Sequence, residues 1–232
     1  MKPRVVSFLL SFVSGFVDTA GFIVLSGIFT AHITGNLVLA GALLIAEKKA
    51  EVWTRFLMLP IFIVGVVITF SMDALMSKTV KSSLRPLLLV QTLLIVAISG
   101  MGFFFEGASH RVLETLPILL TGTVGVLAMS VQNTYMKTHL PRYVPTTVMT
   151  GNMAQFSMDM VPWLLVKTKL REGVAPVESV RKFGVALLGF LAGAICAALV
   201  VSKIGLLSCL LPAMLLLVVM VLKPDEMEIK TT

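Results

Sequence analysis

Residues 5–25 read VVSFLLSFVSGFVDTAGFIVL, an apolar run whose one charged residue is Asp18. A helix needs about 20 mostly apolar residues to cross the hydrocarbon core of a bilayer. The run is longer than the apolar region of a typical signal peptide, and no small-x-small cleavage site follows it, so we interpret it as a retained first helix. The residues before it, Met1-Lys2-Pro3-Arg4, are basic, and we expect this N-terminus to face the cytoplasm.

Similar apolar runs follow along the whole chain. Of its 232 residues, 57% are hydrophobic and 13% are charged, too few charges to cover the surface of a soluble protein. We therefore predict an all-α fold, a polytopic transmembrane helix bundle with no soluble domain. The predicted segments are about 5–25, 29–46, 54–75, 86–105, 115–136, 145–166, 183–203 and 205–223.

The charge pattern and the missing motifs exclude several classes of protein. The net charge is +7, but the basic residues form short clusters between apolar runs, which indicates contact with the lipid bilayer and no nucleic acid partner. The sequence has no HExxH, G-x-S-x-G, CxxC or phosphate-loop motif, and its three histidines are far apart. We therefore expect neither an enzyme, nor a cofactor, nor a metal site.

The chain resembles itself after about half its length. FTAHITGN at 29–36 is similar to PTTVMTGN at 145–152, and FIVG at 62–65 is similar to FLAG at 190–193. Polar and small residues also recur at helical spacing upstream of each Thr-Gly-Asn tripeptide. They are Ser7, Ser11, Ser14, Asp18 and Gly21 in the first half, and Thr121, Gly125, Ala128 and Gln132 in the second. We predict two repeats, 1–112 and 113–232, within one integral membrane domain.

The number of crossings decides how the repeats are oriented. If both Thr-Gly-Asn segments span the bilayer, the chain crosses eight times and the repeats are parallel. If both segments re-enter, it crosses six times and the repeats are inverted, as in many transporters. Both topologies place the two termini in the cytoplasm. We favour eight crossings, because each segment has enough residues to span.

Each Thr-Gly-Asn tripeptide lies inside an apolar segment and follows β-branched residues. Such residues favour extended backbone, glycine permits a change of direction, and Asn or Thr can cap a new helix. A helix that starts there would point its positive end into the membrane, where it could favour an anionic solute. The alternative interpretation is a polar kink that only serves helix packing.

Asp18 lies within its apolar segment, so we expect it to face the bundle or water. The matching position in the second half is Gln132, with Asn133 beside it, and Asp159 follows the second tripeptide. We predict one central polar site, with Asp18 and Asp159 as candidates for proton or ion coupling. Its substrate-binding residues are predicted to be Asp18, Thr34, Gly35, Asn36, Gln132, Asn133, Thr150, Gly151 and Asn152.

Gly189, Gly193 and Ala197 form a ridge of small residues at four-residue spacing. Such ridges let helices pack closely. The ridge could pack against another helix of the same chain or form a homodimer contact, and the sequence does not decide between the two.

The sequence resembles the YoaK-type family of bacterial multi-pass membrane proteins over nearly its whole length. The likeness rests on Gly15-Phe16-Val17-Asp18, on His32-Ile33-Thr34-Gly35-Asn36 and on Met149-Thr150-Gly151-Asn152. The resemblance implies a bacterial inner membrane location and supplies no substrate. The residues themselves favour a small secondary transporter or channel for a small, anionic solute, and a non-transporting membrane scaffold or partner subunit is the alternative.

Overall fold

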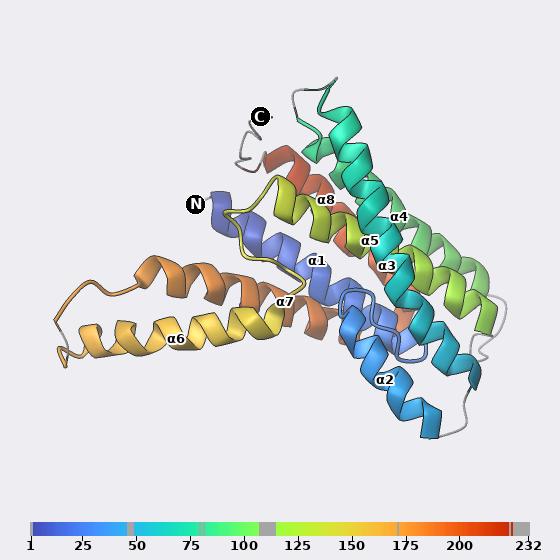
Figure 1. Ribbon diagram of the computed structural model, residues 1–232, viewed down its shortest axis with the longest axis horizontal. Coiled ribbons are helices and arrows are strands. Elements are labelled where there is room, and N and C mark those ends of the chain that lie inside the picture. The colour runs from blue at the N-terminus through green and yellow to red at the C-terminus, as the bar shows by residue number, and fades with distance from the viewer. Residues whose placement is uncertain are drawn as a thin grey trace.

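The computed structural model describes residues 2–45, 49–78, 80, 82–106, 115–170, 172–222 and 224, and the regular elements in these ranges are all helices (Figure 1). They are α1 (Lys2–Val24), α2 (Ile33–Ile45), α3 (Lys49–Met76), α4 (Leu84–Glu106), α5 (Thr115–Thr138), α6 (Met149–Lys167), α7 (Val177–Ile204) and α8 (Leu210–Leu222), with a 3₁₀ turn at Gly205–Cys209. The predicted helical bundle is confirmed. The predicted repeat boundary at 112 lies outside the described residues.

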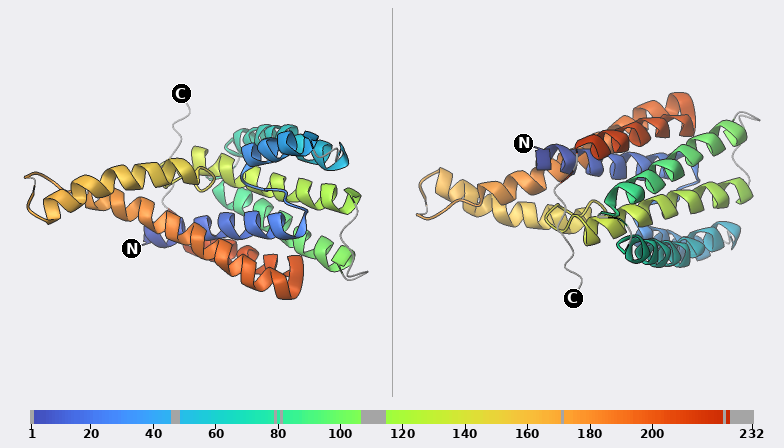
Figure 2. Two further views of the ribbon diagram at one scale, coloured as in Figure 1. Left: turned by 90° about the horizontal axis from the view of Figure 1, so that it is seen from below. Right: turned by 90° about the horizontal axis from the view of Figure 1, so that it is seen from above.

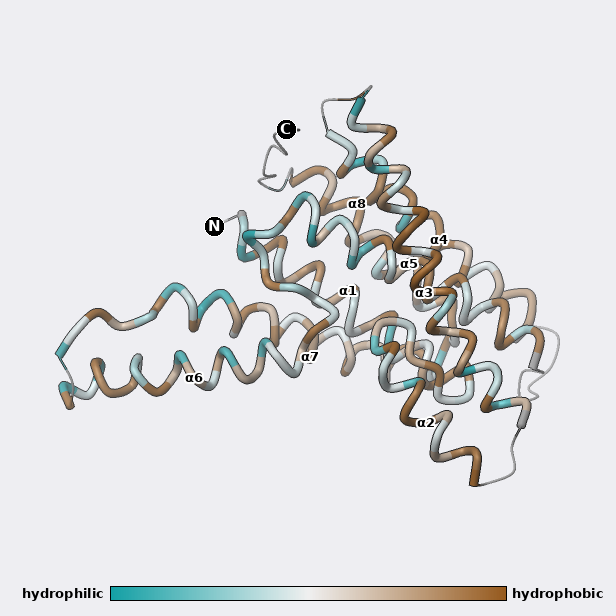
Figure 3. Tube along the Cα trace, in the orientation of Figure 1, coloured by the Kyte–Doolittle hydropathy of each residue, from teal (hydrophilic) through white to brown (hydrophobic). Residues whose placement is uncertain are grey.

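Five stretches of the described chain are long and apolar enough to cross a membrane. They are Pro3–Val24, Ala50–Met76, Leu84–Phe105, Leu116–Thr138 and Val177–Leu222. The last holds α7 and α8, and the chain reverses its direction between them (Figure 1). The outer faces of these five stretches are apolar, as Figure 3 shows for α3. On α3, Ile63, Val67 and Phe70 are each more than half exposed. Such a surface needs lipid around it.

The helix within the segment at 29–46 is shorter than we expected of a membrane-spanning segment. This helix, α2, has 13 residues and so is about 20 Å long, against a hydrocarbon core of about 30 Å. Ser26 and Gly27 have φ of 52° and 80°, and this left-handed turn ends α1 and reverses the chain. Residues 25–32 therefore form a loop, and the Thr-Gly-Asn tripeptide opens a short new helix.

Helices of the two halves pack on each other in a reciprocal pattern. Helix α1 packs on α7 and α8, and α5 packs on α3 and α4, while α2 lies on α3 and α6 lies on α7. Helices α1 and α5 run in opposite directions, and α2 and α6 point toward opposite ends of the molecule (Figure 2). Exchanging the two halves leaves this list of contacts unchanged.

The ridge on α7 packs inside the chain. Gly189, Gly193 and Ala197 are all buried on α7. A Cβ added at Gly189 or Gly193 would collide with the carbonyl groups of Phe8 and Phe12 on α1. The ridge thus serves the close approach of α1 and α7, and it is not exposed for the homodimer contact that we had left open.

Candidate functional site

Asp18 holds the main chain of the loop at 25–32. Its side chain is buried, and its Oδ1 accepts hydrogen bonds from the backbone N–H groups of Thr30 at 2.8 Å and Ala31 at 2.7 Å. The Thr30 hydroxyl and the His32 N–H lie farther away, each at 3.4 Å. Charge-assisted hydrogen bonds of this kind are stronger than neutral ones, so the carboxylate fixes the loop against α1.

His32 occupies the other carboxylate oxygen of Asp18. Its Nδ1 lies 2.5 Å from Asp18 Oδ2, and its side chain is 33% exposed, whereas that of Asp18 is 5% exposed. The imidazole ring makes edge contacts with Phe29 of the same loop and with Phe190 of α7. His32 is therefore the group that connects a buried carboxylate to the surface of the protein.

Asn36 closes the loop from the far side. Its Oδ1 accepts from the Phe29 N–H at 2.8 Å, and its Nδ2 donates to the Phe29 carbonyl at 2.7 Å. Because Phe29 and Thr30 are neighbours, Asn36 and Asp18 hold adjacent residues of the main chain. The two side chains that the sequence placed in one site are in fact brought together by this loop.

A second polar cluster surrounds Gln132 on α5. Gln132 Nε2 donates to the Thr146 hydroxyl at 2.7 Å and to the Leu10 carbonyl of α1 at 2.9 Å. Ser14 donates to the Thr146 carbonyl at 3.0 Å. Asn152 Nδ2 donates to the Pro145 carbonyl at 2.6 Å, seven residues before it, the same separation as between Asn36 and Phe29. The two Thr-Gly-Asn elements thus have matching local contacts.

The two clusters do not enclose one common cavity. Ser14 and Asp18 lie one turn apart on α1, and Ser14 belongs to the second cluster. Thr34, Thr150 and Gly151 are exposed, because only every third or fourth residue of a first helical turn faces inward, and that position is taken by Asn36 and Asn152.

The remaining predicted site residues lie outside the two clusters. Gly35 is half-buried and has no side chain, and its backbone N–H donates to the His32 carbonyl. Asn133 is half-buried, and its side chain takes no part in the polar contacts of the two clusters in the described chain. Asp159 accepts from Gln155 of its own helix at 3.0 Å and from Ser179 of α7 at 2.6 Å. That carboxylate therefore ties α6 to α7.

A buried group that sequence reasoning missed lies where α3, α4 and α5 meet. Asp73 Oδ1 is 2.8 Å from His139 Nε2 and is also hydrogen-bonded to the Ser83 hydroxyl. All three residues are at most 5% exposed. The signal was a carboxylate at the end of an apolar segment, but no spacing rule links Asp73 to a histidine so far along the chain. Within the described ranges, no three His, Cys, Asp or Glu residues are grouped as a metal would require.

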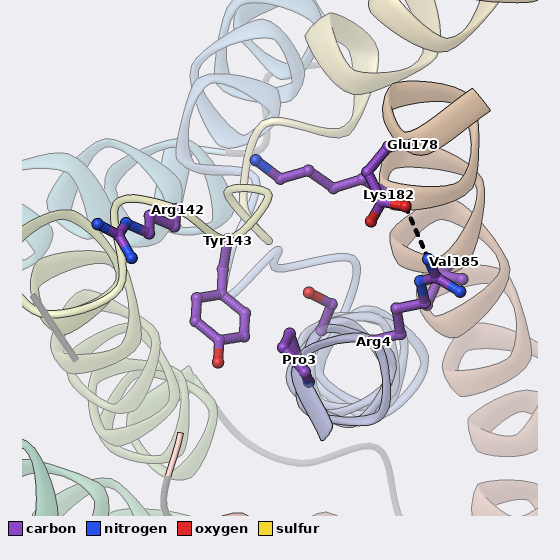
Figure 4. Close-up of a pocket in the computed structure, with 8 residues that line it drawn as sticks. Pro3, Arg4, Arg142, Tyr143, Glu178, Lys182 and Val185 are labelled. Atoms are coloured by element: carbon purple, nitrogen blue, oxygen red, sulfur yellow. Dashed lines mark hydrogen bonds and ion pairs between the residues drawn. The ribbon is translucent and has the colours of Figure 1, made fainter. Parts of the chain in front are cut away.

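A cavity of about 260 Å³ opens where α1 begins (Figure 4). It lies between the start of α1, the start of α7 and the connection from α5 to α6. Its lining residues are Pro3, Arg4, Ser7, Arg142, Tyr143, Glu178, Lys182 and Val185. Sequence reasoning missed it, because its basic residues come from three separate segments.

Comparison with known proteins agrees with this architecture. Residues 6–222 match the family described as "Protein of unknown function (DUF1275)". The chain belongs to the DUF1275 family. It is also similar to the UPF0700 transmembrane protein YoaK of Bacillus subtilis (strain 168), with 27% identity over 160 residues, 68% of each chain. No solved structure matches the chain significantly. The family match and the likeness to YoaK together confirm the resemblance stated for the sequence, and the apolar helices of this chain agree with a multi-pass membrane protein.

Proposed function

We propose that this protein is a small secondary transporter of a bacterial inner membrane, in which Asp18 and His32 form a proton-controlled latch. One observation carries the proposal: a buried carboxylate binds the backbone N–H groups of an interrupted membrane segment and reaches the surface only through a histidine. Buried charges inside a membrane protein are costly and commonly mark ion pathways. Broken helices near the middle of a bundle are a common feature of transporter sites.

The latch is sensitive to protonation because its strength depends on the charge of Asp18. Hydrogen bonds to a charged group contribute roughly 1.5–3 kcal/mol each, about twice the neutral value. A proton bound by the pair of His32 and Asp18 would offset the negative charge that the carboxylate presents to the N–H groups of Thr30 and Ala31, and would weaken both contacts together. The loop would then separate from α1.

Other charged groups near the latch act on a different part of the loop. Arg55 of α3 binds the Ser26 carbonyl and lies 3.7 Å from Glu51. Helix α7 contributes the apolar ring of Phe190. The loop is thus anchored at one end by a permanent cation and at the other by a protonatable carboxylate, and only the second anchor can switch.

A buried polar stripe leads from the latch toward the cavity. Ser7, Ser11, Ser14 and Asp18 follow each other at helical spacing on α1, and all four are at most 5% exposed. Ser7 lines the cavity, and the Ser11 hydroxyl has no hydrogen-bond partner among the described residues. The loop at 25–32 closes one end of this stripe, and the cavity at the start of α1 opens at the other end. This asymmetry is expected of one state of an alternating-access transporter.

The opposite directions of α1 and α5 support the six-crossing topology with inverted repeats (Figure 2). In this topology α1, α3, α4, α5, α7 and α8 cross, while α2 and α6 re-enter. The start of α1 and the end of α8 lie near each other (Figures 1 and 2), which agrees with an even number of crossings. The positive-inside bias favours the cytoplasm for the basic N-terminus and hence for both termini.

Proton flux in proteoliposomes tests the transporter proposal. Vesicles loaded with a pH dye receive a gradient of inorganic phosphate or of one of several small carboxylates, and the internal pH is recorded. The wild-type protein should move protons with at least one of these anions, and Asp18→Asn should abolish that flux while the protein stays folded. Asp159→Asn is the matched control and should retain it. Equal flux in wild type and Asp18→Asn contradicts the proposal.

A non-transporting membrane scaffold is the second candidate. It is favoured by the closed packing around Asp18, where the neighbouring cavity beside Thr30 has a volume of about 10 Å³, room for about one water. The same vesicles decide between the two candidates. A wild-type protein that moves no protons with any of the anions supports the scaffold.

A further inference from the structure

We propose that the cavity at the start of α1 binds a small oxyanion, a phosphate or carboxylate group. Three cationic side chains line it, and they come from α1, from the α5–α6 connection and from α7. The role of this site as the entrance for a transported solute depends on the function proposed above. The binding itself does not.

The charges around the cavity are not balanced. Arg4 is paired with Glu178 at 2.7 Å, and Glu178 is a rim residue whose side chain is 75% exposed. Arg142 and Lys182 have no acidic partner within ion-pair distance among the described residues. Figure 4 shows the Lys182 side chain beside the hollow, and the Arg142 guanidinium directed away from it on the far side of Tyr143. An anion in the hollow would compensate Lys182 directly, and Arg142 once its side chain turns toward the hollow. No acidic group of the described chain lies within ion-pair distance of either cation.

The remaining lining favours a small ligand over bulk water. Tyr143 and Ser7 are buried, and Pro3 and Val185 add apolar surface. Ligand sites commonly combine apolar walls with a few polar groups that fix orientation. A volume of about 260 Å³ admits a small phosphorylated or carboxylated solute but not a macromolecular segment.

The cavity is connected to both polar clusters through the chain. Ser7 begins the buried stripe that ends at Asp18. Tyr143 lies three residues before Thr146, whose hydroxyl is held by Gln132. An anion bound beside Tyr143 would therefore lie next to the connection that leads into α6, the counterpart of the loop at 25–32.

Phosphate binding to the purified full-length protein in nonionic detergent tests the site. Titration calorimetry with inorganic phosphate should show saturable binding to the wild type. The double variant Arg142→Gln/Lys182→Gln should weaken it by at least about tenfold, the factor that corresponds to the loss of one charge-assisted hydrogen bond. Arg181→Gln is the matched control, since Arg181 is exposed, adjacent to Lys182 and outside the lining, and it should bind as the wild type does.

A competition experiment distinguishes the two sources of such an anion. If the natural ligand is a lipid headgroup, nanodiscs containing phosphatidylglycerol should suppress phosphate binding relative to nanodiscs of phosphatidylcholine. If it is a free solute, the two lipids should give equal phosphate affinity. Either result supports an oxyanion site. Absence of saturable phosphate binding in detergent, or an equal loss in Arg181→Gln, overturns it.

The two proposals fail separately. Binding that persists in a protein without proton flux would refute the transporter and retain the anion site. Proton flux in a protein that binds no phosphate would refute the anion site and retain the transporter.

Discussion

At the scale of single residues, the two asparagines of the Thr-Gly-Asn tripeptides hold the main chain that precedes their own helices. Each side chain binds the backbone of the residue seven positions earlier, Phe29 in one case and Pro145 in the other. Asn36 makes two such bonds and Asn152 one to this residue, since proline has no N–H to donate. The first loop is therefore the more firmly closed.

Replacing Asn36 by alanine should open that loop. The change leaves the N–H and carbonyl of Phe29 without partners, and each lost buried hydrogen bond costs roughly 1–3 kcal/mol. We expect a lower unfolding temperature in detergent and faster hydrogen exchange at 28–32. Asn133→Ala is the control, because Asn133 is half-buried and lies outside the polar contacts of both clusters. Similar effects of the two variants would show that the contacts to Phe29 are not special.

The buried pair of Asp73 and His139 gives a second prediction at this scale. Removing one partner of a buried pair costs about 3–5 kcal/mol, whereas removing both costs less than the sum. Asp73→Ala and His139→Leu should therefore each destabilise the protein, and the double variant should be more stable than additivity predicts. Thermal unfolding of the four proteins measures this coupling. Strictly additive losses would refute an energetic link between the two side chains.

At the scale of elements, the contact between α1 and α7 depends on glycine. The two helices approach until backbone atoms touch, as the collision of an added Cβ with the Phe12 carbonyl indicates for Gly193. Close packing and dispersion replace the hydrophobic effect as the force between helices in lipid. The contact joins the first half of the chain to the second.

Gly193→Ala should destabilise the protein, although alanine is the better helix former. The added methyl group meets backbone that cannot move aside, and overpacking costs roughly 1–3 kcal/mol. Gly41→Ala is the matched control, since a Cβ there has no atom within 4 Å, and it should be neutral or stabilising by up to about 1 kcal/mol. Unfolding temperatures in detergent give the comparison. Equal temperatures for the two variants would contradict the packing argument.

At the scale of the whole molecule, the six-crossing topology that we propose would place the ends of α2 and α6 on opposite sides of the membrane. These helices point toward opposite ends of the bundle (Figure 2). Parallel repeats would place both ends on the same side. The side of the membrane on which each end lies therefore distinguishes parallel repeats from the inverted repeats of many alternating-access transporters.

Cysteine labelling in intact cells tests the topology. Cys196 and Cys209 are first replaced, and single cysteines are then placed at Ala50 and Gly173, which follow α2 and α6 and are exposed. We expect an impermeant reagent to label position 50 in intact cells and position 173 only after permeabilisation. Labelling of both positions from the same side would refute inverted repeats. Permeabilised cells serve as the positive control for both sites.

The sequence by itself determined the class of fold and the points where the helices are interrupted. Apolar runs predicted the bundle, the polar stripe of α1 proved to face inward, and α2 and α6 begin at Ile33 and Met149, within the predicted elements. These features follow from hydropathy, helical period and local backbone preference, which act over a few residues. Only the tertiary structure decided that the helix within 29–46 is as short as 13 residues, that Asp18 binds main chain, that Asp73 meets His139 and that three basic segments enclose a cavity. Those outcomes depend on which distant segments pack together, and no local pattern contains that information.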